Sequence, residues 1–521
     1  MNNYISSIIK SIQLTDQLTK IDLVETHISW ILLTGKYAYK IKKPVNLGFL
    51  DFSSLKNRHF YCQEELRLNS RLAPEIYLAV VPITGTYEHP QLNGNGKEID
   101  YAVKMTQFPL NAELSYVVGS NGLTNEHIDN LAKTITLFHQ KIDKTTHQSQ
   151  WGTAKLTHQS TLDTFTTLLE NLNDKNAIER VSRIQDWINQ FFKENKVYFQ
   201  ERHNEGFIRE CHGDLHLRNI ALIDSNIILF DGIEFSESLR WIDVFSEIAF
   251  LIMDLQHQKL NLMAYRFLNA YLESTGDYRG LRLLRYYLVY RTIVRAMVAA
   301  LRANQDDVSD NERAELSNEF NAYVTLAETY IIDKKPVLTI CHGLSASGKS
   351  TVSQSILENL PAIRLRSDVE RKRLFGYDKY QQTSSDVGRN IYDGNSSKKT
   401  YEILKELTSV ILQSNYNVIV DATFLSKYQR REFQLLAINN EVEFVIFDFS
   451  APNELLRARI NKRTKNNKEV SEADINVLEY QIENQDVLSL EESDFAIKID
   501  TQLPFSFQAV KQQLQKHLSK K

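Results

Sequence analysis

The sequence predicts an α+β domain with a small sheet-containing lobe and a larger helical lobe, followed by an α/β domain with a parallel sheet. Strand-like segments and turns are frequent up to about residue 110, and helical periodicity dominates from there to residue 332. Strands then alternate with helices to the end of the chain. Between the two parts, Gly343–Ser350 fits the pattern G-x-x-x-x-G-K-[ST]. The expected domains are 1–332, with lobes at about 25–110 and 111–332, and 333–521.

The composition is that of an ordinary folded protein. The chain has 521 residues, 42% hydrophobic and 24% charged, enough for two or three domains with buried cores. The N-terminus has no basic segment before an apolar core, and the most apolar helical stretch, Phe245–Met253, is too short to span a bilayer. The three cysteines are widely spaced, which indicates reduced thiols rather than disulfides or a zinc site. We therefore expect a cytoplasmic protein without a membrane segment.

The small lobe is expected from a series of strands and turns. Apolar runs flank the turn at Thr34-Gly35, which predicts a β-hairpin, and a second turn at Asn93–Gly96 separates two further strands. The expected strands are 28–33, 36–42, 77–83 and 101–105, and the expected helices are 5–18 and 54–72.

The larger lobe is expected to be mostly helical, because apolar residues recur at helical spacing from residue 125 onward. The expected helices are 125–142, 161–193, 243–255, 259–272, 281–302 and 311–332.

A loop within the helical lobe carries residues that suit phosphoryl transfer. It reads His212-Gly-Asp-Leu-His-Leu-Arg-Asn219, and a short hairpin then leads to Asp231. Kinase chemistry needs an Asp that orients the acceptor hydroxyl, an Asn a few residues later that binds metal, and a second Asp that holds Mg²⁺ on the phosphates. Asp214, Asn219 and Asp231 have that order. Metal ligation by the two histidines of the loop is the alternative, but no third ligand lies nearby in the sequence.

Residues from about 25 to 330 resemble the aminoglycoside phosphotransferase and choline kinase-like superfamily, which has the protein-kinase fold. The family's catalytic loop reads H-G-D-x-x-x-x-N, as does this one. The resemblance implies Asp214 as the catalytic Asp, Asn219 and Asp231 as Mg²⁺ ligands, and Asp243 as a structural acid. No glycine-rich G-x-G-x-x-G loop precedes the hairpin, which is a departure from the protein-kinase pattern.

The phosphate-contacting lysine of this half is expected on the second strand of the first hairpin. Tyr37-Ala-Tyr-Lys40 resembles V-A-I-K, which makes Lys40 the first choice for a nucleotide contact and Lys42 the second. Both lysines point to the same face of a strand, so the pattern cannot separate them. Their helix partner is expected to be Glu64 or Glu65. The alternative for the lysines is a solvated strand end.

The glycine-rich stretch of the second domain fits a phosphate-binding P-loop. A short apolar strand precedes it and an amphipathic helix, 351–360, follows it. Its glycines let backbone N–H groups surround a phosphate, the helix N-terminus adds positive potential, Lys349 reaches the phosphates, and the Ser350 hydroxyl binds Mg²⁺. The expected nucleotide-binding residues are Gly343, Ser345, Ala346, Ser347, Gly348, Lys349, Ser350 and Thr351.

Two acidic residues of the second domain follow strand-like segments, at 362–366 and 417–420, and a third strand is expected at 442–447. In a parallel sheet, sites form at the carboxyl ends of the strands, where Asp368 and Asp421 would lie. A basic segment from Leu455 to Glu469 is expected to form a helix leading into a lid. Its alternative is a solvated helix face.

One pattern in this domain consists of Asp368-x-x-Arg371, Asp421-Ala-Thr, Phe447-Asp, Glu454-Leu, Arg459 and Arg463. It resembles phage polynucleotide 5′-kinase and the small P-loop kinases that include zeta toxins and gluconate kinases. The resemblance covers about 335–520. It implies Asp368 as general base, Arg371 as its neighbour, Asp421 as a site-organising acid and Arg463 as the lid arginine.

We therefore expect an ATP-dependent phosphotransferase with two kinase modules, each using ATP and Mg²⁺ and acting on a hydroxyl of a small molecule. The formal net charge of −4 does not favour a nucleic-acid partner. A second domain that phosphorylates the 5′-hydroxyl ends of nucleic acids is one alternative, and a half that only binds ATP to regulate the other is a second. The acceptors and the oligomeric state are left open by the sequence.

Overall fold

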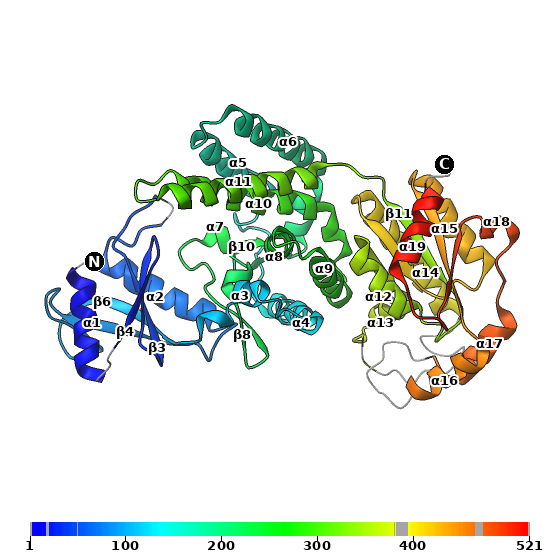
Figure 1. Ribbon diagram of the computed structural model, residues 1–521, viewed down its shortest axis with the longest axis horizontal. Helices are drawn as coiled ribbons and strands as arrows, with labels where there is room; N and C mark the ends of the chain where they lie inside the picture. Colours follow the sequence, from blue (N-terminus) through cyan, green and yellow to red (C-terminus); the bar gives the residue numbers. More distant parts are fainter. Residues whose placement is uncertain are drawn as a thin grey trace. The chain divides into compact units, whose positions relative to one another are not determined.

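The computed structural model of the protein describes residues 3–16, 20–48, 50–379, 381, 394–463 and 473–518. The chain forms two compact units, and the first, unit 1, comprises residues 1–167 and 199–254. The second, unit 2, comprises residues 168–198 and 255–521. Each unit is described by itself below (Figure 1).

Unit 1 contains a six-stranded antiparallel sheet with the order β1-β2-β3-β6-β4-β5. The predicted hairpin and the two later strands are confirmed, whereas the two edge strands β1 and β5 were not predicted. β1 is almost entirely exposed and therefore shows no apolar alternation. The strands are β1 Asp22–Glu25, β2 Ser29–Leu33, β3 Tyr37–Lys42, β4 Tyr77–Gly85, β5 Pro90–Leu92 and β6 Glu98–Thr106.

Two helices accompany this sheet. Helix α1 (Asn3–Asp16) packs its isoleucines against a core that includes Trp30 and Leu32 of the sheet. Helix α2 (Leu55–Asn69) begins at Ser54, whose side chain accepts a hydrogen bond from the backbone N–H of Asn57.

The rest of unit 1 is mainly helical, as predicted, with one difference. The helix expected at 161–193 is two helices, α5 (Ala154–Glu170) and α6 (Lys175–Asn204), and most of α6 belongs to unit 2. The break occurs because Asp174 caps α6, accepting a hydrogen bond of 2.9 Å from the N–H of Ala177. The remaining elements are α3 Leu114–Gly119, α4 Asn125–Lys141, β7 Ile208–Glu210, β8 Ile220–Ile223, β9 Asn226–Leu229, α7 Glu237–Arg240, β10 Trp241–Asp243, α8 Val244–His257, and 3₁₀ turns at Leu110–Ala112 and Leu217–Asn219.

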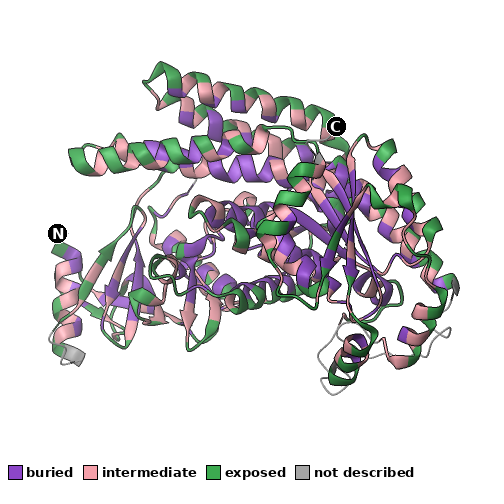
Figure 2. Ribbon diagram, turned by 45° about the vertical axis from the view of Figure 1, so that its right-hand side comes forward, coloured by how far each residue is buried: buried purple, intermediate pink, exposed green. Residues whose placement is uncertain are grey.

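Unit 2 is built on a five-stranded parallel sheet with the order β12-β13-β11-β14-β15. Most residues of the four strands other than β15 are buried, as Figure 2 shows. The fifth strand was not predicted, although alternate residues of it are buried. The strands are β11 Val337–His342, β12 Ala362–Arg366, β13 Asn417–Asp421, β14 Glu443–Ser450 and β15 Ala496–Asp500.

Helices of unit 2 come from both sides of the P-loop in the sequence. Most of α6 and three further helices precede the sheet in the sequence, and the other described helices alternate with its strands. Besides α6, the first group contains α9 Asn261–Thr275, α10 Leu281–Ala303 and α11 Asp310–Ile331, with a 3₁₀ turn at Tyr278–Gly280. The second group is α12 Lys349–Asn359, α13 Ser367–Leu374, α14 Gly394–Gln413, α15 Lys427–Asn439, α16 Asn453–Arg463, α17 Ile475–Asn484, α18 Leu490–Ser493 and α19 Phe507–Leu518.

The predicted fold class is confirmed. The chain has a protein-kinase-like region, with an antiparallel sheet and a helical lobe, followed by an α/β P-loop domain with a parallel sheet. Helices α9–α11 belong to the same compact unit as the parallel sheet. The functional division between residues 332 and 333 stays a prediction.

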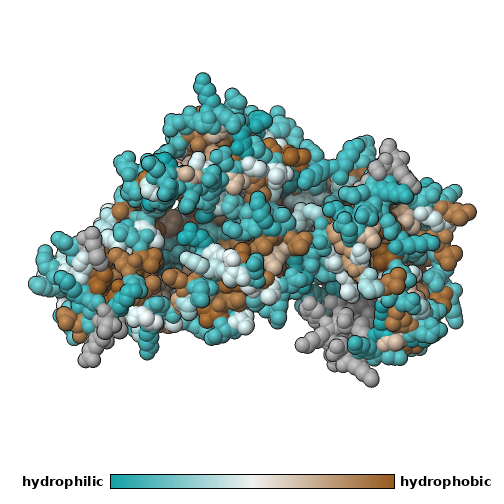
Figure 3. Space-filling view, viewed as in Figure 1, coloured by the Kyte–Doolittle hydropathy of each residue, from teal (hydrophilic) through white to brown (hydrophobic). Residues whose placement is uncertain are grey.

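The surface is mixed in polarity. Figure 3 shows hydrophilic residues over most of the face it presents, with hydrophobic residues in separate groups among them. Among the described residues, no helix combines the length and the apolar character needed to cross a lipid bilayer.

The close packing of the P-loop strand predicts that Gly343→Ala destabilises unit 2. A Cβ there would lie 2.5 Å from the carbonyl oxygen of Phe449, and the backbone φ is +140°. We expect a loss of about 2 to 4 kcal/mol in the free energy of unfolding, measured by urea denaturation followed by circular dichroism. The control is Gly376→Ala, where φ is +76° and no atom lies within 4 Å. Equal shifts for the two variants would contradict the steric argument.

Candidate active sites

Three charged residues from distant parts of the sequence meet in unit 1. Nζ of Lys40, on β3, lies 2.8 Å from Oε1 of Glu65, on α2. The same Nζ lies 2.5 Å from Oδ1 of Asp231, which follows β9. Lys40 and Glu65 are buried, whereas the Asp231 side chain is 45% exposed. The cluster therefore presents one accessible carboxylate in front of a buried ion pair.

The second lysine of β3 lies behind this pair. Nζ of Lys42 is 2.7 Å from Oε2 of Glu65 and also pairs with Glu234, and all three side chains are buried. Glu64 faces elsewhere, toward Arg67 at 2.8 Å. The structure thus brings both candidate lysines to Glu65, and Lys40 is the one that also contacts Asp231.

Charge pairing keeps this network ionised in spite of its burial. Burial alone would lower the pKa of Lys40, but the carboxylates of Asp231, Glu65 and Glu234 raise it well above its ordinary value. Burial alone would raise the pKa of Glu65, but Lys40 and Lys42 lower it. Burial raises the pKa of Glu234 above the usual range. A buried carboxylate shared by two lysines fixes the position of both.

The loop that follows β7 brings Asp214 and Asn219 together. Nδ2 of Asn219 donates hydrogen bonds of 2.9 Å to the backbone oxygen and to Oδ2 of Asp214. Nε2 of His216 lies 3.3 Å from the same carboxylate oxygen, and the Asp214 side chain is 36% exposed. The backbone N–H of Asp231 donates a hydrogen bond of 3.0 Å to the hydroxyl of Tyr77. The backbone of Asp231 is in the left-handed conformation, with φ +61°.

The first residue of the loop, His212, uses its ring nitrogens in contacts with the backbone. Nε2 of His212 is 2.8 Å from the backbone oxygen of Phe230, and Nδ1 accepts a hydrogen bond of 3.3 Å from the N–H of Asp214. Both ring nitrogens therefore have partners in the protein, one in the loop and one after β9. This supports the sequence interpretation that His212 is not a metal ligand.

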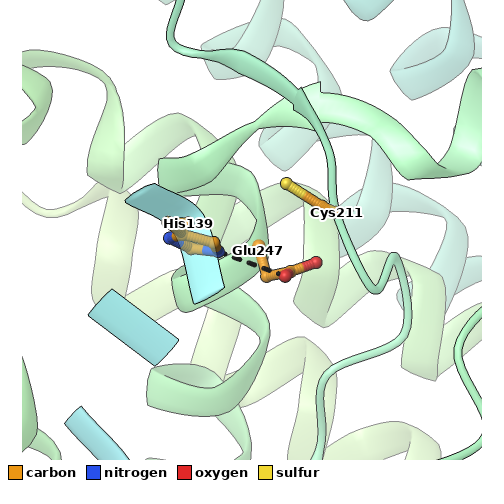
Figure 4. A group of neighbouring side chains, drawn as sticks. All are labelled: His139, Cys211 and Glu247. Carbon is orange, nitrogen blue, oxygen red and sulfur yellow. Dashed lines mark hydrogen bonds and ion pairs between the residues drawn. The ribbon is translucent and has the colours of Figure 1, made fainter. Parts of the chain in front are cut away.

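A buried group beneath the loop consists of His139, Cys211 and Glu247, and Figure 4 shows their side chains side by side. Glu247 accepts hydrogen bonds from two backbone N–H groups of the loop, those of His212 at 3.1 Å and Gly213 at 2.8 Å. Nε2 of His139 lies 3.2 Å from Oε1 of the same carboxylate. Glu247 therefore anchors the loop that carries Asp214.

The same group does not have the chemistry of a metal site. Both oxygens of Glu247 already accept backbone hydrogen bonds. Burial, together with the charge of Glu247, raises the pKa of the Cys211 thiol well above its ordinary value. A metal would need the thiolate, which this environment disfavours.

Glu247 was missed by sequence reasoning, which assigned the structural role in this region to Asp243. Asp243 forms a buried ion pair with Arg202, at 2.6 and 2.8 Å, and accepts from the N–H of Phe245. It thus supports helix α8, whereas Glu247 holds the loop itself. The signal was the single acidic residue within the apolar stretch Phe245–Met253.

The P-loop of unit 2 joins β11 to α12. Nζ of Lys349 donates to the backbone oxygens of Gly343 at 2.9 Å and Leu344 at 2.7 Å, so the lysine folds back over the loop. Gly348 has φ +88° and Ala346 has φ +62°, which turns backbone N–H groups toward the centre of the loop. This is the geometry of an anion-binding turn at a helix N-terminus.

A pocket of about 1000 Å³ opens beside the P-loop. Ser345, Ala346, Gly348, Lys349, Ser350 and Thr351 line it, and so do Asp368 and Asp421. Nη1 of Arg371 lies 3.0 Å from Oδ1 of Asp368. The structure therefore brings six of the eight candidate P-loop residues and both predicted strand-end acids to one pocket, whereas Gly343 and Ser347 are not among its lining residues.

Two residues at the P-loop were not predicted to contact it. Oε1 of Gln481, on α17, accepts a hydrogen bond of 2.8 Å from the N–H of Ser345. Nη1 of Arg459, on α16, lies 3.2 Å from the backbone oxygen of Ala346 and 3.0 Å from Oγ1 of Thr501. Arg463, the predicted lid arginine, ends α16, and its side chain lies outside the described residues.

Comparisons with known proteins match different parts of the chain. The family model described as an AAA domain matches residues 338–488, within unit 2. An uncharacterized protein of Mycobacterium tuberculosis is 26% identical over 451 residues, which cover 87% of this chain and 88% of that protein. A protein of Mycobacterium bovis gives the same values.

Two solved structures are similar to one part of the chain each. Amicoumacin kinase hAmiN, at 14% identity and a TM-score of 0.38, covers 62% of this chain and 96% of its own. A gluconokinase from Sinorhizobium meliloti, at 17% identity and a TM-score of 0.25, covers 36% of this chain and 94% of its own.

The buried network predicts a large difference between two neighbouring glutamates. Glu65→Gln leaves two buried lysines undercompensated, so we expect unfolding to become easier by about 3 to 5 kcal/mol at neutral pH. Glu64→Gln removes a partly exposed ion pair and should cost less than about 1 kcal/mol. Urea denaturation of both variants tests this, and equal losses would contradict it.

The Glu65 effect should also depend on pH. The pKa of Glu65 is lowered from 4.5 to about 2, because the lysines outweigh the effect of burial. Its charge therefore stabilises the folded state fully above pH 4.5, and this stabilisation is lost as pH falls toward the folded-state pKa. The difference between the wild-type protein and Glu65→Gln should shrink in that window. A constant difference would contradict the assignment.

Proposed function

We propose that the protein is an ATP-dependent phosphotransferase with two sites, one in each unit, and that each transfers the γ-phosphoryl group of ATP to a hydroxyl of a small molecule. The observation that carries the proposal is the meeting of Lys40, Glu65 and Asp231 near the Asp214–Asn219 contact. Kinase-type phosphoryl transfer needs this set of a phosphate-binding lysine, its glutamate partner, metal-binding oxygens and an acid for the acceptor hydroxyl.

In unit 1, Lys40 contacts the phosphates and Glu65 keeps its ammonium group in place. Asp214 orients the acceptor hydroxyl and accepts its proton, while Glu247 fixes the backbone of the loop. Asn219 and Asp231 supply amide and carboxylate oxygens, which are the donors that Mg²⁺ prefers. The exposed fractions of the Asp214 and Asp231 side chains support this assignment, since both must reach substrate. Bound Mg²⁺ would neutralise charge on the phosphates.

In unit 2, backbone N–H groups of the P-loop and the N-terminus of α12 hold the β-phosphate. Lys349 exchanges its contacts with the loop oxygens for the phosphates. Ser350 and Asp421 are the Mg²⁺-binding residues, and Oδ2 of Asp421 supports this because it is buried without a hydrogen bond among the described residues. Asp368 acts as the general base, with Arg371 beside it, and Arg463 serves as the lid arginine.

The pocket favours a small acceptor over a nucleic-acid strand. A volume of about 1000 Å³ holds a nucleotide and a small molecule together. The formal net charge of −4 gives no general attraction for a polyanion. The three cysteines are free and buried, which supports a cytoplasmic location.

Two independent nucleotide sites are the first consequence. Lys349→Ala removes the positive charge of the P-loop, and Asp231→Ala removes a metal-binding carboxylate of unit 1. Calorimetry with a non-hydrolysable ATP analogue and Mg²⁺ should count two sites in the intact protein and one in each variant.

The double variant should bind no nucleotide, which controls for a third site. A single site in the intact protein that Lys349→Ala abolishes would remove unit 1 from the proposal. Two sites that both disappear in one single variant would show that they are not independent.

The roles proposed for the two acids of unit 1 predict different losses. Asp214→Asn should leave affinity for Mg-ATP nearly unchanged but lower kcat by at least about a hundredfold, because the acceptor hydroxyl loses its base. Asp231→Asn should weaken metal-dependent nucleotide binding instead. Calorimetry on both variants, with turnover from a metabolite-extract screen using γ-labelled ATP, measures the two effects. Equal loss of nucleotide binding in both would contradict the roles assigned.

A further inference from the structure

A buried carboxylate on α9, a helix that precedes the P-loop in the sequence, lies among arginines of the parallel-sheet domain. Oε1 of Glu273 accepts hydrogen bonds from Nε and Nη2 of Arg364, at 3.2 and 2.8 Å. Oε2 of Glu273 lies 3.7 Å from Nη1 of Arg366. The backbone oxygen of Glu273 accepts from Nη2 of Arg373 at 2.6 Å. One glutamate thus contacts β12 and α13 at the same time.

Glu273 is charged at neutral pH in this environment. Burial alone would raise its pKa, but Arg364, Arg366 and Lys379 lower it. Oε1 is used by Arg364, which in turn donates to the backbone oxygen of Ser350 at 3.0 Å. The other oxygen, Oε2, faces the guanidinium of Arg366.

Arg366 lies between two carboxylates. It ends β12 and is the register partner of Asp421, which ends β13. Its Nε is 3.8 Å from Oδ2 of Asp421, while its Nη1 is 3.7 Å from Oε2 of Glu273. Both Arg366 and Asp421 line the pocket at the P-loop, whereas Glu273 is not among its lining residues. Neither of these two distances is short enough for a hydrogen bond. The two carboxylates therefore attract the guanidinium of Arg366 from similar distances.

The side-chain amide of one residue, Asn269, fixes the position of α9 against β12 through hydrogen bonds to the strand backbone. Oδ1 of Asn269 accepts from the N–H of Arg364 at 2.7 Å, and its Nδ2 donates to the backbone oxygen of Ala362 at 3.0 Å. One side-chain amide therefore pairs with this edge strand as a neighbouring strand would. Glu273, one turn further along the helix, is held in register with Arg364 and Arg366.

We propose that Glu273 is a positioning residue of the P-loop site: it holds Arg366 away from Asp421 and so keeps the Asp421 carboxylate available for Mg²⁺. The inference rests on the function proposed for unit 2. Without the charge of Glu273, Arg366 closes the gap of 3.8 Å and forms a direct ion pair with Asp421. The acid is then neutralised, while the backbone cradle of the P-loop is unchanged.

The test measures how nucleotide binding at the P-loop depends on Mg²⁺. Calorimetry uses the full-length protein with Asp231→Ala, so that only nucleotide binding at the P-loop site is measured. Glu273→Gln should raise the Mg²⁺ concentration for half-maximal binding of a non-hydrolysable ATP analogue by about tenfold. Its affinity for metal-free ADP should stay within about twofold, because the substitution keeps the phosphate cradle. A loss of both affinities would indicate general damage and overturn the proposal.

The matched control breaks a different ion pair made by the same helix α9, this one with α12. Arg266, on α9, lies 2.5 Å from Glu358 near the far end of α12. Arg266→Gln should change the Mg²⁺ requirement by less than about twofold. An effect as large as that of Glu273→Gln would overturn the proposal.

A double-variant cycle identifies Arg366 as the mediator. In protein with Arg366→Gln, adding Glu273→Gln should leave the Mg²⁺ requirement unchanged, because no guanidinium remains to neutralise Asp421. A repeated tenfold rise would overturn the proposal. The comparison of Arg366→Gln with the double variant also tests the proposal if Glu273→Gln alone fails to fold. The double variant removes one charge of each sign, so the buried charges stay balanced. Absence of nucleotide binding before any change at Glu273 would overturn the proposed function of unit 2 instead.

Discussion

A charge in a protein interior must be balanced by an opposite charge, and both candidate sites are built on this constraint. In unit 1, the fully buried Glu65 balances Lys40 and Lys42. In unit 2, Glu273 and Arg364 balance each other beneath the P-loop. The partners in each pair come from separate elements, so the ion pairs can form only when those elements have packed together. The interactions that hold each fold together therefore also place the groups proposed to do the chemistry.

The four acidic residues assigned to the site of unit 1 or to its support fall into two groups by exposure, and the division follows their proposed roles. Asp214 and Asp231, which would meet substrate or metal, have side chains 36% and 45% exposed. Glu65 and Glu247, which hold other parts of the site, are at most 1% exposed. A reacting group must be reachable, whereas a group that fixes a lysine or a loop works best when water cannot compete for its hydrogen bonds. In unit 1, burial thus separates the acids proposed to act from those that position them.

Local patterns in the sequence predicted the fold class, the loop from His212 to Asn219 and the P-loop, because each depends on residues close together in the chain. The choice between Lys40 and Lys42 could not be predicted, since both lie on one face of β3 and both reach Glu65. Glu247 was missed because its partners are backbone N–H groups, which carry no sequence signal. β15 was missed since its alternation extends over only five residues, which is too short a segment to give a clear signal.

The role of α9 could not be predicted for a deeper reason. The partners of Asn269 and Glu273 lie on β12, the edge strand of a sheet whose strands come much later in the chain. An exposed edge strand presents unpaired N–H and C=O groups, and a parallel sheet needs its edges covered. Here the cover for β12 is a helix that precedes the P-loop, and the same helix supplies the carboxylate facing Arg364 and Arg366. A sheet domain cut at the P-loop strand would keep its motif but lose both that cover and the charge that balances its buried arginines. The physical unit around the P-loop is therefore larger than the segment its sequence motifs mark.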